Sequence, residues 1–401
     1  LRNKSVPSPD GEGLGVRLLK IKMMNYDSIR CYNPDELQDV YTRLLADPMF
    51  QKVVGFVLPG IPLEQVEMTM RSCKTNLEFQ KTFCYMFLHN LLEKASDGLS
   101  VDFKDVDVSK RYTFISNHRD IVLDSALLSK VLVDAGFDTT CEIAIGDNLL
   151  AWPWVEDLVR TTKAFIVRRG LSLREQLIAS KMLSSYMHHV VNDKHDNLWI
   201  AQREGRAKDS DDRTQPAILK MIAMDGEGDI IDRLNAMHIS PLSISYEYDP
   251  CDILKAQEFQ LKRDNPGWKK SKADDVNSMK TGILGYKGHV VYRATKCMDD
   301  FLETLRETPK TEVFDRIAAQ MDKQIHSAYE IYPVNYVALD RLNGTRDHYN
   351  NGYTDAEEQK VDAYLQMQMQ KIVIPNPDKE FLMETMLTMY ANPLRNRMAA
   401  E

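Results

Sequence analysis

Residues 114–124 read Phe-Ile-Ser-Asn-His-Arg-Asp-Ile-Val-Leu-Asp. An apolar, β-prone run passes into a polar turn, and an apolar helical stretch follows. Further short apolar runs recur along the chain, most of them separated by helical stretches, at 141–145, 163–167, 198–201, 242–246 and 289–292. Strands that alternate with helices predict an α/β fold. We expect a central, mostly parallel or mixed sheet that is flanked by helices.

Helices are expected on both sides of this region of the sequence. Apolar residues recur at helical spacing over 34–50 and 63–95, and again over most of 297–401. A capping box formed by Ser172 and Glu175 predicts the start of one helix between two strands. We therefore divide the chain into four parts: a flexible tail (1–16), a helical N-terminal region (17–108), an α/β domain (109–296) and C-terminal helices packed on that domain (297–401).

The composition narrows the class of protein. Hydrophobic residues make up 43% and charged residues 27% of the 401 residues, which excludes a disordered or fibrous chain. The net charge of −8 disfavours a nucleic-acid-binding protein. Six scattered cysteines without a Cys-x-x-Cys pair favour a reduced compartment and no zinc motif. No signal peptide or run of about 20 apolar residues is visible. We expect a cytoplasmic protein that can touch the inner face of the membrane peripherally.

The polar turn presents a histidine near two carboxylates. A carboxylate that fixes the imidazole tautomer lets histidine act as a general base toward a hydroxyl. His118 is therefore a candidate catalytic base, with Asp120 or Asp124 as its partner. A lone histidine is more often a surface group, so this chemistry depends on what the fold brings beside it.

Arginines follow two other predicted strands. One pair comes directly after the run 163–167, and a second pair flanks a Glu-Gly step after the run 198–201. A guanidinium fork binds phosphate oxygens in pairs, and glycine lets the backbone approach an anion closely. Ligands of α/β sheets bind at the carboxyl ends of the strands. A candidate phosphate site therefore contains Arg168, Arg169, Arg203 and Arg206.

Four ordered blocks over about residues 110–250 resemble the glycerolipid acyltransferase family. This family contains the glycerol-3-phosphate and 1-acylglycerol-3-phosphate O-acyltransferases. The blocks are Asn117-His118 with a following Asp, an apolar strand that ends in Arg168, the Glu204-Gly205 step, and an apolar strand with Pro241. The stretches 147–153, 165–169 and 204–216 look most like the bacterial glycerol-3-phosphate acyltransferases.

The sequence departs from the family pattern at two positions. Asp124 lies six positions after His118, where the family has five, so the turn holds one extra residue. In the family, an apolar helix follows the Asp that pairs with the histidine. We assign that role to Asp124, which an apolar stretch follows here, and Asp120 is the alternative partner of His118. Ala207 stands where the family has a serine after the arginine of the third block.

The resemblance implies an O-acyltransferase of phospholipid synthesis that needs no metal or cofactor. His118 would take a proton from a hydroxyl of glycerol-3-phosphate or of 1-acylglycerol-3-phosphate (lysophosphatidate). The acyl group would come from a thioester of coenzyme A or of acyl carrier protein. The arginines would hold the acceptor phosphate, and the remaining substrate-binding candidates are Asn117, Arg119, Glu204, Gly205 and Pro241.

Other readings stay open. The acceptor could be another lipid, of the ornithine-lipid or lipid A type, or the chain could bind acyl chains or phospholipid without catalysis. The basic stretch 261–272, which includes Trp268, could contact anionic lipid or acyl carrier protein, or be a solvated loop. The Met-rich stretches 367–369 and 383–389 could line an acyl groove or simply pack in a core.

Overall fold

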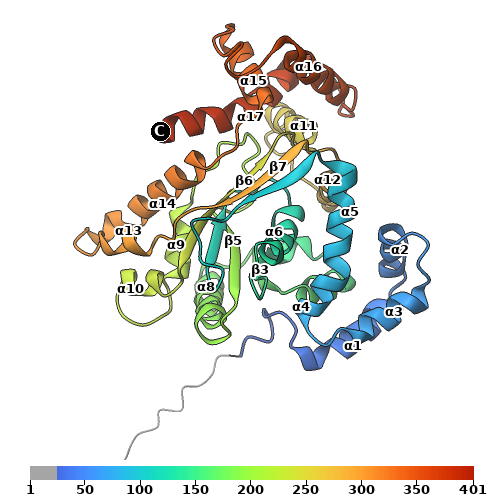
Figure 1. The fold of residues 1–401 in the computed structure, drawn as a ribbon, viewed down its shortest axis with the longest axis vertical. Coiled ribbons are helices and arrows are strands. Elements are labelled where there is room, and N and C mark those ends of the chain that lie inside the picture. The colour runs from blue at the N-terminus through green and yellow to red at the C-terminus, as the bar shows by residue number, and fades with distance from the viewer. Residues whose placement is uncertain (1–24) are drawn as a thin grey trace, which may run out of the picture.

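A computed structural model describes residues 25–401, so the predicted tail over 1–16 lies outside the described residues. The described part contains a seven-stranded sheet in the order β1-β7-β6-β2-β5-β3-β4 (Figure 1). Neighbouring strands run parallel except β6 and β7, which are antiparallel. The mostly parallel α/β fold predicted from the sequence is thereby confirmed. The strands are β1 (Gly98–Asp102), β2 (Thr113–Ser116), β3 (Cys141–Gly146), β4 (Ala164–Val167), β5 (Asn197–Ala201), β6 (Ile239–Tyr246) and β7 (His289–Ala294).

Helices bury both faces of the sheet. Successive side chains of a strand point to opposite faces, so Ile115 of β2 packs with α8, α9 and α14. Its neighbour Phe114 packs with α5 and α6 on the other face. This double burial explains why β2 reads as a continuous apolar run. The covering helices are α5 (Tyr85–Ala95), α6 (Leu123–Asp134), α8 (Leu173–His188), α9 (Pro216–Ile222) and α14 (Lys310–Ser327).

The two long N-terminal helices predicted from the sequence are each broken, and that prediction is wrong. Asp47 leaves the helical conformation before Pro48, and its carboxylate accepts N–H bonds at the start of the next helix. The second break falls at Thr75, which forms a capping box with Glu78. The segments are α1 (Leu37–Ala46), α2 (Pro48–Val57), α3 (Leu63–Ser72) and α4 (Asn76–Phe79), the last continuing through a π-helical turn into α5. Helix α8 does begin at the predicted box of Ser172 and Glu175.

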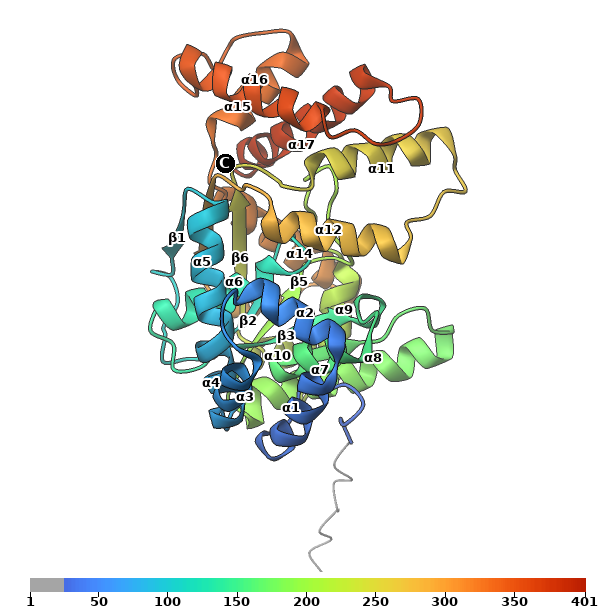
Figure 2. The same cartoon turned by 90° about the vertical axis from the view of Figure 1, so that its right-hand side faces the viewer.

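The last three helices of the chain form a separate apolar cluster with α11 (Figure 2). Met386 and Met389 are buried in this cluster. The Met-rich stretch around them therefore packs in a core and does not line a groove. The domain boundaries given above remain a prediction. The other helices are α7 (Pro153–Thr161), α10 (Ile230–Asn235), α11 (Asp252–Asp264), α12 (Lys272–Leu284), α13 (Asp299–Glu303), α15 (Pro333–Asn343), α16 (Asp355–Met369) and α17 (Lys379–Ala400).

One buried carboxyl joins three of these helices and makes stability depend on pH. Asp252 Oδ2 of α11 accepts hydrogen bonds from the hydroxyls of Tyr364 at 2.8 Å and Tyr390 at 2.7 Å. Burial raises the pKa of Asp252 to about 6, above that of an unfolded chain, so the native state holds the proton more tightly. The free energy of unfolding should therefore fall as pH rises from about 4 to about 6.

Asp252→Asn removes this ionisation and should flatten that part of the stability profile by about 2 kcal/mol. Urea unfolding at pH 4 and pH 6 measures the difference. Asp315→Asn, on the exposed side of α14, is the control and should leave the wild-type difference intact. An Asp252→Asn protein with the same pH difference as wild type would contradict the role of this carboxyl.

Candidate active site

Three strand ends meet at the carboxyl edge of the parallel strands. His118 follows β2, Arg168 follows β4 and Arg203 follows β5. They border one cavity of about 820 Å³. Seven of the predicted site residues line it: His118, Arg168, Arg169, Arg203, Glu204, Gly205 and Arg206. The structure thus gathers residues from three separate sequence blocks around a single space.

His118 is held by Asp124. The Nδ1 atom of His118 lies 2.7 Å from Oδ2 of Asp124, which is fully buried. The same carboxylate oxygen accepts the backbone N–H groups of Arg119 at 2.6 Å and Asp120 at 3.0 Å. A proton on Nδ1, donated to the carboxylate, leaves the lone pair on Nε2. The cavity-lining imidazole can therefore accept a proton from a hydroxyl bound there.

Asp120, the alternative partner of His118, bonds instead to the backbone at the start of α6. Its Oδ1 accepts the N–H groups of Val122 at 2.9 Å and Leu123 at 2.7 Å, at the start of α6. Burial and the nearby charge of Asp124 raise the pKa of the Asp120 carboxyl. The extra residue of the turn is accommodated because the chain wraps around the Asp124 carboxylate. Of the two candidates, the structure places Asp124 against His118.

Two arginines offer unused donors. Arg203 Nε and Arg206 Nη1 are buried and find no hydrogen-bond partner among the described residues. A buried donor without an acceptor is costly, and an anion in the cavity would supply the acceptor. Gly205 between them has φ +69°, a left-handed conformation that glycine adopts without strain.

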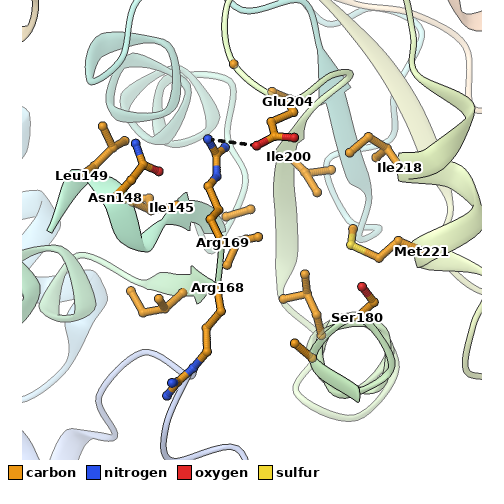
Figure 3. A pocket seen from close by; sticks show the side chains of 18 of the residues that line it. Ile145, Asn148, Leu149, Arg168, Arg169, Ser180, Ile200, Glu204, Ile218 and Met221 are labelled. Atoms are coloured by element: carbon orange, nitrogen blue, oxygen red, sulfur yellow. Dashed lines mark ion pairs between the residues drawn. The ribbon is translucent and has the colours of Figure 1, made fainter. Parts of the chain in front are cut away.

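The second arginine pair splits across the cavity (Figure 3). Arg169 turns toward Glu204, with 3.4 Å between Nη1 and Oε1, while Arg168 points the opposite way. Both lie at the surface. The remaining lining includes a set of apolar side chains from several elements: Ile29, Ile145, Leu149, Ile166, Ile178, Met182, Leu183, Ile218 and Met221. The cavity therefore combines cationic groups with an apolar wall.

Three residues predicted to contact substrate do not line this cavity, and their contact with substrate stays a prediction. Asn117 is buried and exchanges two 2.8 Å hydrogen bonds with the backbone of Ile244, which ties β2 to β6. Arg119 forms a buried ion pair with Asp212 at 2.8 Å and stacks on Tyr329. Pro241 is buried inside β6, which begins two residues earlier. These side chains support the elements that carry the site and do not line its cavity.

The structure adds residues that the sequence did not single out. Trp199 of β5 places its ring 5.7 Å from that of His118, edge to face, and its Nε1 donates to Ser116 Oγ. Lys208 and Lys270 also line the cavity. Lys270 belongs to the basic stretch 261–272 and pairs with Asp275 at 2.7 Å, while Lys208 and Lys262 both pair with Glu258. Trp199 could have been predicted at the site, because its strand, β5, pairs with β2.

A comparison with protein families addresses the same region. Residues 99–217 match the Acyltransferase family. The chain carries an acyltransferase domain. The family predicted from the sequence is confirmed by this match, and with it the prediction of an enzyme that transfers acyl groups. The acyltransferase domain includes the His118 turn and both arginine pairs, while β6 with Pro241 lies outside the matched residues.

Other comparisons are more distant. The crystal structure of the 1-acyl-sn-glycerophosphate (LPA) acyltransferase PlsC from Thermotoga maritima is similar at 13% identity, over 71% of this chain and 98% of that chain, with a TM-score of 0.32. No curated protein matches the chain. Within residues 25–401, none of the helices has the length and apolar character needed to cross a membrane.

Proposed function

We propose that this acyltransferase moves a fatty acyl group from an acyl thioester to a hydroxyl of glycerol-3-phosphate or 1-acylglycerol-3-phosphate, with His118 as general base. One observation carries the proposal. His118, joined to the buried Asp124 at 2.7 Å, lines the same cavity as Arg203 and Arg206, which carry buried, unpartnered donors. The base can take a proton from a hydroxyl, and the two guanidinium groups can bind a phosphate. This combination suits an acyl acceptor that carries both a hydroxyl and a phosphate.

The chemistry needs only the side chains described. His118 Nε2 takes the proton of the acceptor hydroxyl as the oxygen attacks the thioester carbonyl. The imidazolium that forms lies against the negative charge of Asp124. When the tetrahedral intermediate collapses, the C–S bond breaks, and the leaving thiolate takes the proton from His118. The new ester and a free thiol are the products, and the enzyme returns to its starting state.

The rest of the cavity supports the same substrates. Arg203 and Arg206 offer guanidinium N–H groups to phosphate oxygens. The apolar wall from α8 and α9 suits a fatty acyl chain. Lys208 and Lys270 at the cavity suit the phosphates of coenzyme A or the acidic surface of an acyl carrier protein. Peripheral contact with a membrane, which the lipid product requires, stays part of this proposal.

Product analysis with the purified full chain tests the proposal. Palmitoyl-coenzyme A and palmitoyl carrier protein are each supplied with glycerol-3-phosphate or its 1-acyl form. Thiol release and mass spectrometry of the lipid are then measured. We expect acceptor-dependent thiol release with glycerol-3-phosphate, the acceptor favoured by the resemblance of the arginine blocks. If thiol is released only with an ornithine lipid or a lipid A precursor, the acyl acceptor belongs to that class of lipid. Binding of acyl chains without any thiol release would make the chain a lipid-binding protein.

Arg206→Gln should raise KM for the phosphate acceptor by about ten- to a hundredfold, because a charge-assisted hydrogen bond contributes about 1.5–3 kcal/mol. Arg206→Lys keeps the charge without the fork and should show a smaller rise. Steady-state kinetics at saturating donor measures both. Arg174→Gln, exposed on α8 outside the cavity lining, is the control and should match wild type. Unchanged KM in a folded Arg206→Gln protein would remove Arg206 from the phosphate site.

A further inference from the structure

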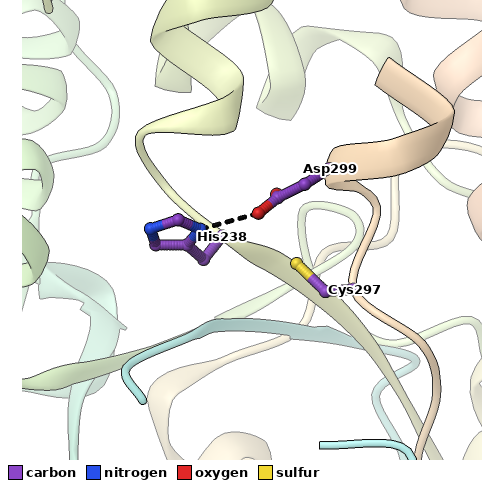
Figure 4. Close-up of side chains that lie close together, drawn as sticks. All are labelled: His238, Cys297 and Asp299. Atoms are coloured by element: carbon purple, nitrogen blue, oxygen red, sulfur yellow. Dashed lines mark hydrogen bonds and ion pairs between the residues drawn. The ribbon is translucent and has the colours of Figure 1, made fainter. Parts of the chain in front are cut away.

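Three side chains of types that can bind metal ions lie close together at the edge of the sheet opposite the cavity. His238 precedes β6, while Cys297 and Asp299 lie where the chain leaves β7 and enters α13 (Figure 4). His238 Nδ1 lies 2.7 Å from Asp299 Oδ2. One ligand atom from each of the three residues lies within 4.8 Å of the others. We propose that His238, Cys297 and Asp299 bind a zinc-like divalent ion.

The donor set fits this class of ion. Imidazole nitrogen, thiolate sulfur and carboxylate oxygen are the three ligand types of protein-bound zinc. With bonds of about 2.0–2.3 Å, ligand atoms around one zinc ion lie no more than about 4.5 Å apart. Small side-chain rotations would therefore close the trio around the ion. Three protein ligands leave one tetrahedral position, and the half-exposed His238 leaves room for water there.

The backbone holds the three residues in place. Met298, between the two later ligands, donates its N–H to the carbonyl of Ile239, next to His238, at 2.8 Å. A second bond of 2.9 Å joins Thr295 to Pro241 in the same pair of segments. His238 has φ +44°, a left-handed conformation that is unfavourable for a non-glycine residue and that turns the chain here. The ligands thus start from neighbouring positions that the main chain already joins.

One ligand oxygen has no competing partner. Asp299 Oδ1 is buried and lacks a hydrogen bond within residues 25–401. Cys297 is a free thiol that is partly buried. On coordination the thiol proton passes to solvent, and sulfur, nitrogen and oxygen then share the ion. Only the folded chain brings these ligands together, so binding should stabilise the native state.

Cobalt titration of the metal-stripped full chain tests the site. Co²⁺ bound to a thiolate gives a charge-transfer absorption that nitrogen and oxygen ligands alone do not give. We expect one equivalent with that absorption in wild type, and its loss in Cys297→Ser. Cys84→Ser, at the free cysteine directly before α5 and outside the trio, is the control and should retain it. No thiolate absorption with Co²⁺ in excess, or absorption that survives Cys297→Ser, would overturn the proposal.

Thermal unfolding with Zn²⁺ gives the second readout. Zinc should raise Tm of wild type by several degrees, since binding to the native state alone adds to its stability. His238→Ala should lose this rise. His89→Ala, an exposed histidine on α5, should keep it. A zinc-dependent rise that persists in His238→Ala would place the ion elsewhere and contradict the site. The residues lie outside the proposed catalytic cavity, so the result is independent of the acyl-transfer proposal.

Discussion

His118→Ala is expected to lower kcat/KM for acyl transfer about a thousandfold, the usual contribution of a positioned general base. The imidazole borders the cavity and is fixed by Asp124 and by the ring of Trp199. An alanine methyl group cannot take the hydroxyl proton, and water in its place would be neither oriented nor charge-stabilised. Thiol release with glycerol-3-phosphate as acceptor measures the loss.

The control for this prediction is another histidine–carboxylate pair. His89 of α5 lies 3.4 Å from Glu93 at the surface, and His89→Ala should have wild-type kinetics. Near-UV and far-UV circular dichroism spectra and Tm establish that both variants are folded. Full activity in a folded His118→Ala protein would exclude His118 as the base.

Asp124→Asn is expected to reduce turnover about a hundredfold while the protein stays folded. The amide oxygen can still accept the three hydrogen bonds that now go to Oδ2, from His118, Arg119 and Asp120. The negative charge beside the imidazolium is lost, so proton uptake in the transition state becomes harder. The effect should therefore fall on kcat, with little change in the KM of the acceptor.

Asp120→Asn separates the two carboxylates. Asp120 accepts two backbone N–H groups at the start of α6, and an asparagine oxygen can accept the same bonds. We expect a much smaller loss of turnover than in Asp124→Asn. The reverse order, with Asp120→Asn inactive and Asp124→Asn close to wild type, would assign the partner role to Asp120.

Much of the architecture follows from short-range patterns. Apolar runs located six of the seven strands, because strands buried on both faces stay apolar throughout. Strand β1 was missed, since it is only partly buried at the edge of the sheet and its sequence is mixed. The broken N-terminal helices were predictable in principle, because Asp47-Pro48 and the Thr75–Glu78 box are local signals.

Part of the site depends on contacts between residues that are distant in sequence, which local patterns cannot predict. The sequence order of the blocks predicted the residues around the cavity, since carboxyl ends of parallel strands share one edge. It did not predict that Arg119 would lie outside the cavity lining, because its partner Asp212 is distant in sequence. The trio of His238, Cys297 and Asp299 was invisible for the same reason. No compact motif joins residues that only a strand pairing brings together.

The reversed direction of β7 has a consequence for how this protein can be studied. Because β7 runs antiparallel to β6, the chain that follows β7 emerges at the amino edge of the strands that carry the His118 cavity. Cys297 is therefore a thiol on the far side of the sheet from His118. A Co²⁺ ion bound there, as in the titration above, would report on this edge of the sheet by its absorption without entering the His118 cavity, and turnover could be followed in the loaded enzyme.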